Sequence, residues 1–157
     1  MRSHLASLDE ISTMLIDSEL FKHLPTTEIF TAARYFGIAQ VAREEIVFSE
    51  GDLGIHLCIV HSGCVAVIKA NQDERLVEMF RVPRGRAFGE MAVLDGERRS
   101  ATCKATEDSI LLTLAKSSLD KMLEDHPRIG ARILRAIAIG LSRRLRLAVG
   151  KLVDHIV

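Results

Sequence analysis

The sequence has no excess of either charge, because its 21 Lys and Arg residues equal its 21 Asp and Glu residues. A protein that coats nucleic acid over its whole surface carries a clear positive excess, so this composition argues against that class. The balance is uneven along the chain. From residue 127 to the end, seven basic residues face a single acidic residue, which gives this tail a net charge of +6.

Cysteines and targeting signals are also scarce. Cys58, Cys64 and Cys103 are an odd number without CxxC spacing, which predicts reduced, mostly buried thiols rather than a disulfide framework. The N-terminal residues lack the apolar core of a signal peptide. The apolar segment 129–149 contains five arginines, so it cannot span a bilayer. We therefore expect a cytoplasmic protein with no membrane segment.

Signals for catalysis or metal binding are missing. A metal-dependent enzyme of the cupin type needs a His-x-His pair with a nearby Glu and a further His. His56 and His61 are five residues apart, so on one strand they would face opposite sides. The cysteines show no nucleophile–base pair. We expect a protein that is not an enzyme and holds neither a metal nor a cofactor; metal analysis would test the cupin alternative.

The chain divides into three zones that we interpret as one domain spanning residues 1–157. Residues from about 6 to 36 show helical spacing, as at Leu8, Ile11 and Leu15. From about 38 to 115, short β-prone runs alternate with turn signals such as Ser62-Gly63. Residues from about 116 to 156 are helical again. This order predicts an α+β, mainly β, fold with an antiparallel sandwich or barrel between helical ends.

The last zone contains a long helix that begins at Pro127, a residue favoured at a first helical position. Its apolar stripe has helical spacing and comprises Leu134, Ile137, Leu141, Leu145, Ala148, Leu152 and Ile156. A helix of about 28 residues reaches about 42 Å, which is more than the β zone needs for cover. We therefore expect part of the stripe to meet another surface.

The segment 86–102 interrupts the strand pattern. A strand reaches Phe88, and the residues from Gly89 to Leu94 then show no alternation. This favours a glycine turn into a single helical turn, whose free backbone N–H groups make an anion site. An arginine and a hydroxyl follow at Arg99 and Ser100, which suits a phosphate with one negative charge.

Glu90 lies in the same segment, where a carboxylate would repel an anion. We expect it to face away from the phosphate and to accept hydrogen bonds from neutral hydroxyls, such as those of a ribose. An ordinary surface ion pair between Glu and Arg is the alternative, and it demands no such glycine-led context.

This stretch resembles the phosphate-binding cassette of cyclic nucleotide-binding domains, a family that includes cAMP receptor proteins, regulatory subunits of cAMP-dependent kinase and cyclic-nucleotide-gated channels. The shared pattern is Phe-Gly-Glu, a small apolar stretch, eight residues from Glu to Arg, and then a small residue and Ala-Thr. Eight residues separate Glu90 from Arg99, so the spacing selects Arg99 over Arg98. Gly51 and Gly63 match turns of the family's β-roll.

The resemblance implies a β-roll, or jelly-roll, with N-terminal helices and a long C-terminal helix. Glu90 would bind the ribose 2′-hydroxyl and Arg99 the cyclic phosphate. The implied nucleotide site comprises Phe88, Gly89, Glu90, Met91, Ala92, Arg99, Ser100 and Ala101. In the family the C-terminal helix caps the purine, and the candidates here are Leu141, Arg143 and Arg144.

The resemblance also implies a regulatory domain that binds cAMP and signals through its C-terminal helix to an unknown protein or to a second copy in a homodimer. Ser100 does not decide between cAMP and cGMP, and a cyclic dinucleotide stays open. A second hypothesis is the remnant of a cAMP-receptor-like transcription regulator that associates with DNA through Arg143-Arg144-x-Arg146. The net charge and the likeness of this helix to the family's capping helix disfavour nucleic acid as a partner.

Overall fold

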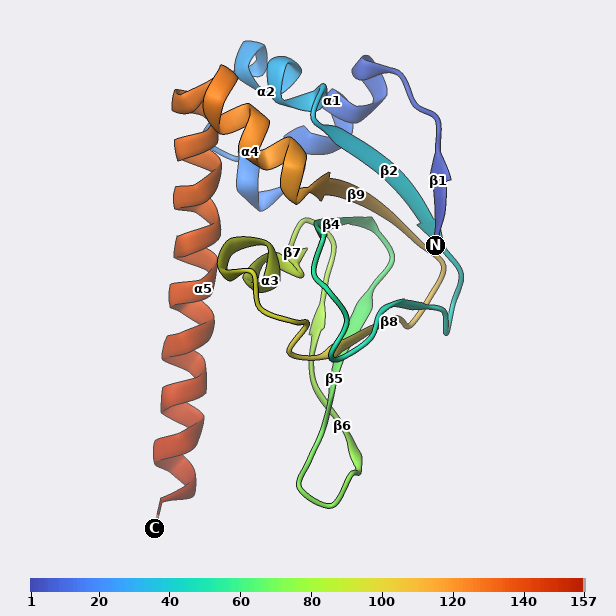
Figure 1. Ribbon diagram of the computed structural model, residues 1–157, viewed down its shortest axis with the longest axis vertical. Coiled ribbons are helices and arrows are strands. Elements are labelled where there is room, and N and C mark those ends of the chain that lie inside the picture. The colour runs from blue at the N-terminus through green and yellow to red at the C-terminus, as the bar shows by residue number, and fades with distance from the viewer. Residues whose placement is uncertain (157) are drawn as a thin grey trace.

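The computed structural model describes residues 1–156, in which two antiparallel sheets form a roll with helices at one end and along one side (Figure 1). The strands are β1 (Arg2–His4), β2 (Phe36–Val41), β3 (Ile46–Phe48), β4 (His56–Ser62), β5 (Val65–Ala70), β6 (Leu76–Val82), β7 (Ala87–Phe88), β8 (Thr102–Ala105) and β9 (Ser109–Ala115). The helices are α1 (Leu8–Ile16), the 3₁₀ helix η1 (Glu19–Phe21), α2 (Thr26–Ala33), α3 (Glu90–Asp95), α4 (Lys116–Asp125) and α5 (Pro127–His155).

The two sheets have the strand orders β1-β2-β9-β4-β7 and β3-β8-β5-β6. Strand β9 lies at the centre of the larger sheet and pairs antiparallel with both β2 and β4. In this register Leu114 lies opposite Phe36 on one side and Leu57 on the other. The α+β fold with an antiparallel roll and a long C-terminal helix is therefore confirmed.

Around β4 the larger sheet is buried on both faces, which explains the unbroken apolar run of this strand. Leu57 and Ile59 face the helices, whereas Cys58 and Val60 face the interior of the roll. Successive side chains of a strand point to opposite faces, so a strand covered on both sides must be apolar throughout. The roll thus places one core between helices and sheet and a second core between the two sheets.

One local feature differs from the pattern expected from the sequence. Strand β1 was not expected, because its three residues are all exposed and show no alternation; it pairs with β2 through Arg2 and Gln40. Helix α4 begins at Lys116 after the N-cap Ala115, close to the start expected for the last helical zone. Helix α5 begins at Pro127 as expected.

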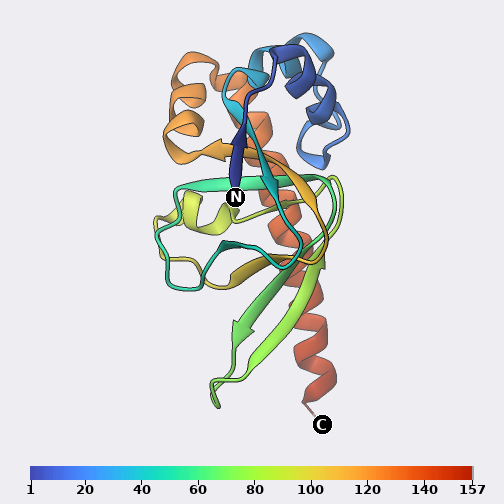
Figure 2. The ribbon, with the colours of Figure 1, turned by 90° about the vertical axis from the view of Figure 1, so that its right-hand side faces the viewer.

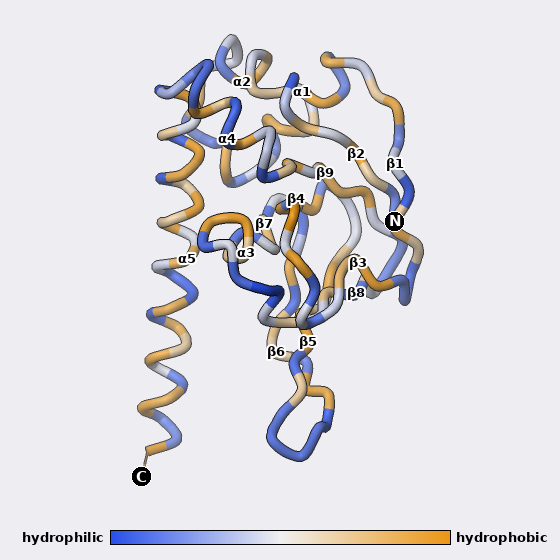
Figure 3. Tube along the Cα trace, in the orientation of Figure 1, coloured by the Kyte–Doolittle hydropathy of each residue, from blue (hydrophilic) through white to orange (hydrophobic). Residues whose placement is uncertain are grey.

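Helix α5 packs with its first half against the helical end of the molecule, and its second half runs down beside the roll as far as the β5–β6 hairpin (Figures 1 and 2). Ile133 and Ile137 are buried, and Arg132 forms an ion pair of 2.6 Å with Glu28 of α2. Leu145 and Leu152 of the predicted stripe are exposed. Figure 3 shows apolar and polar residues alternating down this distal half.

None of the helices within residues 1–156 is both long enough and apolar enough to cross a membrane.

Candidate functional site: a phosphate cradle beside a cavity

The cradle, defined here as residues 88–101, forms where the chain leaves β7 and returns to β8. Gly89 has a left-handed φ of 76° and starts α3 without a side-chain cap. A Cβ atom at Gly89 would lie 2.8 Å from Arg99 Nη1 and 3.0 Å from the Phe48 ring. Only glycine suits both the backbone angle and the space, so the start of α3 packs directly against Arg99 and Phe48.

Arg99 is a buried cation without an acidic partner. The residue is 3% exposed, and its Nη1 and Nη2 donate to the carbonyl oxygens of Gly89 at 2.6 Å and His56 at 2.5 Å. Its guanidinium carbon lies 3.7 Å from the centre of the Phe48 ring. Nε is buried with no partner, and no carboxylate of residues 1–156 lies within ion-pair distance. Burial lowers the pKa of Arg99, because removing the guanidinium from water disfavours its charged form.

Arg98 has the opposite environment. It is exposed, and its Nη1 donates to the carbonyl of Gly51 at 3.1 Å. The structure thus separates the two neighbouring arginines in the way that the spacing predicts: Arg99 faces the interior of the cradle and Arg98 faces solvent.

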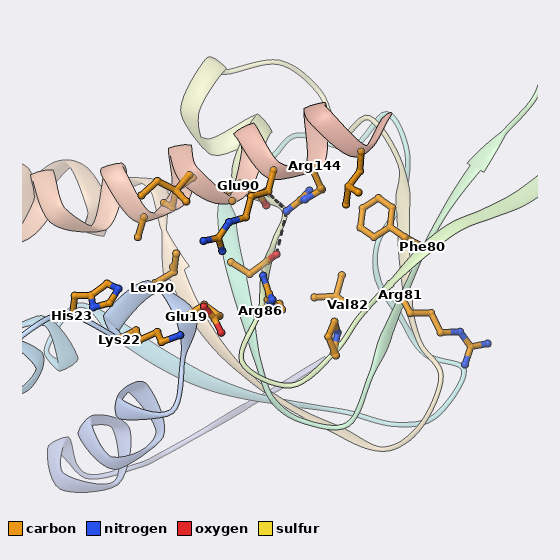
Figure 4. Close-up of a pocket in the computed structure, with 18 residues that line it drawn as sticks. Glu19, Leu20, Lys22, His23, Phe80, Arg81, Val82, Arg86, Glu90 and Arg144 are labelled. Atoms are coloured by element: carbon orange, nitrogen blue, oxygen red, sulfur yellow. Dashed lines mark hydrogen bonds and ion pairs between the residues drawn. The ribbon is translucent and has the colours of Figure 1, made fainter. Parts of the chain in front are cut away.

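Glu90 is a buried carboxylate in which only one of the two oxygens has a hydrogen-bond partner. The residue is 2% exposed, and its Oε1 accepts a hydrogen bond of 2.5 Å from Nη2 of Arg144 on α5 (Figure 4). Its Oε2 is buried and has no partner. Arg144 also approaches the carbonyl of Ala87 at 3.4 Å and lies 5.4 Å from the centre of the Phe80 ring. An acceptor is therefore available at the edge of the cradle.

His56 also lies beside Arg99 and Phe48; from the sequence it was considered only as a cupin-type metal ligand, a role that its spacing from His61 disfavours. Its ring lies 6.4 Å from that of Phe48, and its Nε2 is buried without a partner. Burial and then the Arg99 charge lower the pKa of His56, so the ring is neutral. Five buried side-chain polar atoms in the described chain lack a partner, and three of them belong to Arg99, Glu90 and His56.

The other predicted cradle residues divide by exposure. Phe88, Ala92 and Ala101 are buried, and the Phe88 ring lies 5.8 Å from that of Phe48. Met91 and Ser100 are exposed. The Ser100 carbonyl accepts a hydrogen bond of 2.6 Å from Lys69. The side chains of Met91 and Ser100 thus lie outside the buried interior of the cradle.

A cavity of about 530 Å³ opens beside the cradle, between η1, the β6–β7 segment and α5. Glu90 and Arg144 line it, whereas Arg99 does not, so Glu90 lies at the boundary between cavity and buried cradle (Figure 4). Of the three candidates for the purine cap, Arg143 and Arg144 line the cavity. Leu141 packs against the core on the helical side instead.

The described residues contain no group of three or more His, Cys, Asp or Glu side chains able to hold a metal ion. Cys58 and Cys103 are buried inside the roll. Burial raises the pKa of the Cys103 thiol to about 12, which keeps it protonated.

Comparisons with known proteins identify the family of this chain. The family model for the cyclic nucleotide-binding domain matches residues 38–126. The cyclic AMP receptor protein of Thermus thermophilus is 34% identical over 82% of this chain, which spans 58% of that protein. A putative potassium channel protein of Rhodopseudomonas palustris is 29% identical over 89% of this chain, which spans 34% of it.

A solved structure has the same fold. The crystal structure of a cyclic nucleotide-binding domain from Methylobacillus flagellatus superimposes with a TM-score of 0.84 at 25% identity, covering 96% of this chain and 84% of that one. The match of the family model includes both Glu90 and Arg99. This chain belongs to the cyclic nucleotide-binding domain family.

Proposed function

We propose that residues 1–157 act as one non-catalytic regulatory domain that binds cAMP, with the cyclic phosphate on Arg99 and the ribose 2′-hydroxyl on Glu90. The observation that carries this proposal is a complementary pair of unsatisfied groups in one cradle. Arg99 supplies a buried positive charge and a free N–H donor, and Glu90 supplies a free acceptor. A cyclic phosphate is an anion and an acceptor, and a ribose hydroxyl is a donor, so a cyclic nucleotide satisfies both.

The N-terminal turn of α3 supports the same assignment. Gly89 leaves the first N–H groups of this helix without a side-chain cap, and they start beside the Arg99 guanidinium. Backbone N–H donors and a cation together form a site for one negative charge. The phosphate thus replaces the acidic partner that Arg99 lacks.

The link between Glu90 and Arg144 suggests how binding is reported. Glu90 has two oxygens: Oε1 binds Arg144 of α5, and Oε2 is free for the ribose. One carboxylate therefore joins the nucleotide to α5, and a ligand that fixes Glu90 also fixes the position of this helix. Such coupling requires different nucleotide affinities in the two positions of α5.

We propose that α5 transmits this change to a second copy of the chain, and through the dimer to a downstream protein. The exposed residues Leu145, Val149, Leu152 and Ile156 recur at intervals of three and four, which is the spacing of a coiled-coil seam. Helix pairing would bury this stripe, which the roll leaves uncovered. The buried thiols suit a cytoplasmic location.

Calorimetric titration with cAMP and cGMP tests the nucleotide site, with Arg98→Ala as the matched control for Arg99→Ala. A charge-assisted hydrogen bond contributes about 1.5–3 kcal/mol, so we expect Arg99→Ala to weaken binding by about tenfold or more. Arg98→Ala should bind as the unmodified chain does. Equal titration curves for the unmodified chain and Arg99→Ala would refute the role of Arg99.

A further inference from the structure

His56, the first residue of β4, lies against Arg99 through its backbone and through its ring. Its carbonyl oxygen accepts the hydrogen bond of 2.5 Å from Arg99 Nη2, and its ring packs edge to face against the Phe48 ring, on which the Arg99 guanidinium also lies. The Nε2 atom of the His56 ring is buried and has no partner among residues 1–156. Because the carbonyl contact belongs to the backbone, it is kept when the side chain is replaced. The imidazole is therefore a separate group of the cluster, and it does not hold Arg99 in place.

The charges around this ring are unbalanced in the free chain. Arg99 has no carboxylate within ion-pair distance in residues 1–156. Glu90 does not compensate it, because Arg144 already pairs with that carboxylate at 2.5 Å. A proton on His56 would add a second positive charge beside Arg99. Burial of the ring and then this charge lower the pKa of His56 in the free chain.

The other titratable groups of the cluster do not restore the balance. Besides Glu90, the groups next to Arg99 or to the strand pair of His56 are Asp52, Cys58, Cys103 and Lys116. Both thiols stay protonated, because burial raises their pKa. Asp52 and Lys116 are exposed, so water and salt screen their charges. Histidine is the side chain that ordinarily changes charge near neutral pH, so His56 is the group of this cluster that an anionic ligand can titrate.

We propose that His56 takes up a proton when the nucleotide binds, which makes nucleotide affinity increase as the pH falls. This inference rests on the proposed function, because it assumes that the cyclic phosphate lies on Arg99. The phosphate neutralises Arg99, so the charge that opposes a proton on His56 is compensated in the complex. A protonated ring donates from both nitrogens, and the phosphate brings acceptor oxygens into a cluster where Nε2 has no partner.

Linkage between binding and protonation gives the sign of the effect. A ligand that favours the protonated form of a group binds more tightly when that group is protonated, so binding strengthens on acidification. The cyclic phosphate of cAMP stays a monoanion near neutral pH and contributes nothing to this change. If the pKa of His56 is higher by about one in the complex than in the free chain, the gain in affinity is at most about tenfold.

Calorimetric titration of the full chain with cAMP at about pH 7.5, 6.5 and 5.5 tests the proposal. Titrations at one pH in two buffers with different heats of protonation also give the number of protons taken up with each nucleotide. We expect the affinity of the unmodified chain to rise by about threefold to tenfold between the highest and the lowest pH, with proton uptake. His56→Gln keeps a polar side chain that cannot gain a proton, so this variant should show neither the rise nor the uptake.

His61→Gln is the matched control. His61 lies on the same strand, and burial and then the charge of Arg84 lower its pKa in the same way. Arg84 differs from Arg99 because it has an acidic partner, Asp17, at 3.1 Å. It also lies outside the cradle, so the phosphate does not change its charge balance. His61→Gln should therefore keep the pH dependence and the proton uptake of the unmodified chain. Thermal unfolding at each pH verifies that all three proteins are folded.

Three results would overturn the inference and leave the proposed function standing. One is an unmodified chain whose affinity is the same at every pH, without proton uptake. Another is an affinity that falls on acidification. The last is a His56→Gln variant that keeps the full pH dependence, because another group would then take up the proton. A chain that binds neither cAMP nor cGMP at any of these pH values would refute the proposed function as well.

Discussion

At the scale of single residues, the cradle contains two buried charges, Arg99 and Glu90, whose surroundings differ. Arg99 has a charge that protein groups do not neutralise, whereas Glu90 has its charge neutralised by Arg144 and one oxygen left over. A buried polar atom without a partner costs about 1–3 kcal/mol. The unpaired atoms of both residues therefore lower the stability of the folded chain, and a ligand that forms hydrogen bonds with them removes this loss.

The role of Glu90 predicts a coupling between one protein atom and one ligand atom. Glu90→Gln keeps the size of the side chain but weakens the acceptor, and 2′-deoxy-cAMP lacks the donor. Each change alone should weaken binding by about tenfold, since a hydrogen bond to a charged group contributes about 1.5–3 kcal/mol. Combined, they should cost little more than one change alone, as calorimetry of all four pairs can show. Additive losses would mean that the ribose hydroxyl does not contact Glu90.

His56 makes the stability of the domain dependent on pH. Its pKa is lowered by burial and by Arg99, whereas the unfolded chain has the usual value of about 6.5. As the pH falls through that usual value, His56 binds a proton in the unfolded state but stays neutral in the folded state. The free energy of unfolding therefore decreases. Above that pH, the His56 ring is neutral in both the folded and the unfolded state, so it contributes no pH dependence.

We therefore expect acidification from about pH 7.5 to about pH 5.5 to lower the melting temperature of the unmodified chain more than that of His56→Gln, by on the order of a few °C. Thermal unfolding followed by circular dichroism measures the difference. His61, whose pKa burial also lowers, stays in both proteins and cancels in the comparison. Parallel pH profiles would show that His56 is not the titrating group.

At the scale of elements, the cradle depends on close approach between α3 and the loop before β4. A Cβ atom at Gly54 would lie 2.2 Å from the Cβ of Ala92 and 3.4 Å from the guanidinium carbon of Arg99. The loop thus fixes α3 and Arg99 together, and no side chain fits between them.

Gly54→Ala should displace α3 and cost about 1–3 kcal/mol of stability, the usual penalty of overpacking. Nucleotide affinity should fall with it, because the N–H groups of α3 move away from Arg99. Gly150→Ala on α5 is the matched control, since a Cβ atom there meets nothing within 4 Å. Denaturant unfolding and calorimetry measure the two effects; a Gly54→Ala variant with unchanged binding would show that the cradle adapts.

The elements also show what could be predicted from the sequence. The three zones and the cradle depend on local patterns, such as the glycine turn at Gly89, so they could be predicted. The contact of Glu90 with Arg144 joins α3 to α5, and no local pattern encodes a contact between distant residues. His56 gave no signal for the same reason, because its role follows from the packing of Phe48 and Arg99 around it.

At the scale of the whole molecule, α5 takes part in two separate features. Its middle part lines the cavity, and its distal half carries an exposed apolar stripe. A second copy of the helix is the occupant that we propose for the stripe. The seam and the cavity lie on one helix, so a change in one can reach the other without passing through the roll.

The dimer predicts a concentration-dependent change in sedimentation. The double variant Leu145→Glu, Leu152→Glu should remain monomeric where the unmodified chain sediments as a dimer, because four charges would face one another in the seam. Leu5→Glu is the control, since Leu5 is 98% exposed outside α5. Circular dichroism should show an unchanged fold for both. An unmodified chain that is monomeric at every concentration would contradict the proposal.

The central position of β9 has a consequence for how the chain folds. Its partners β2 and β4 come much earlier in the sequence, so the larger sheet cannot close until residues 109–115 have met strands that begin at 36 and 56. Bringing such distant segments together lowers the entropy of the intervening chain before the hydrogen bonds between the strands can compensate for it. We expect closure of this sheet to limit the folding rate, on a time scale of roughly milliseconds to seconds. Until then, the faces of β4 that later form both cores remain open to solvent.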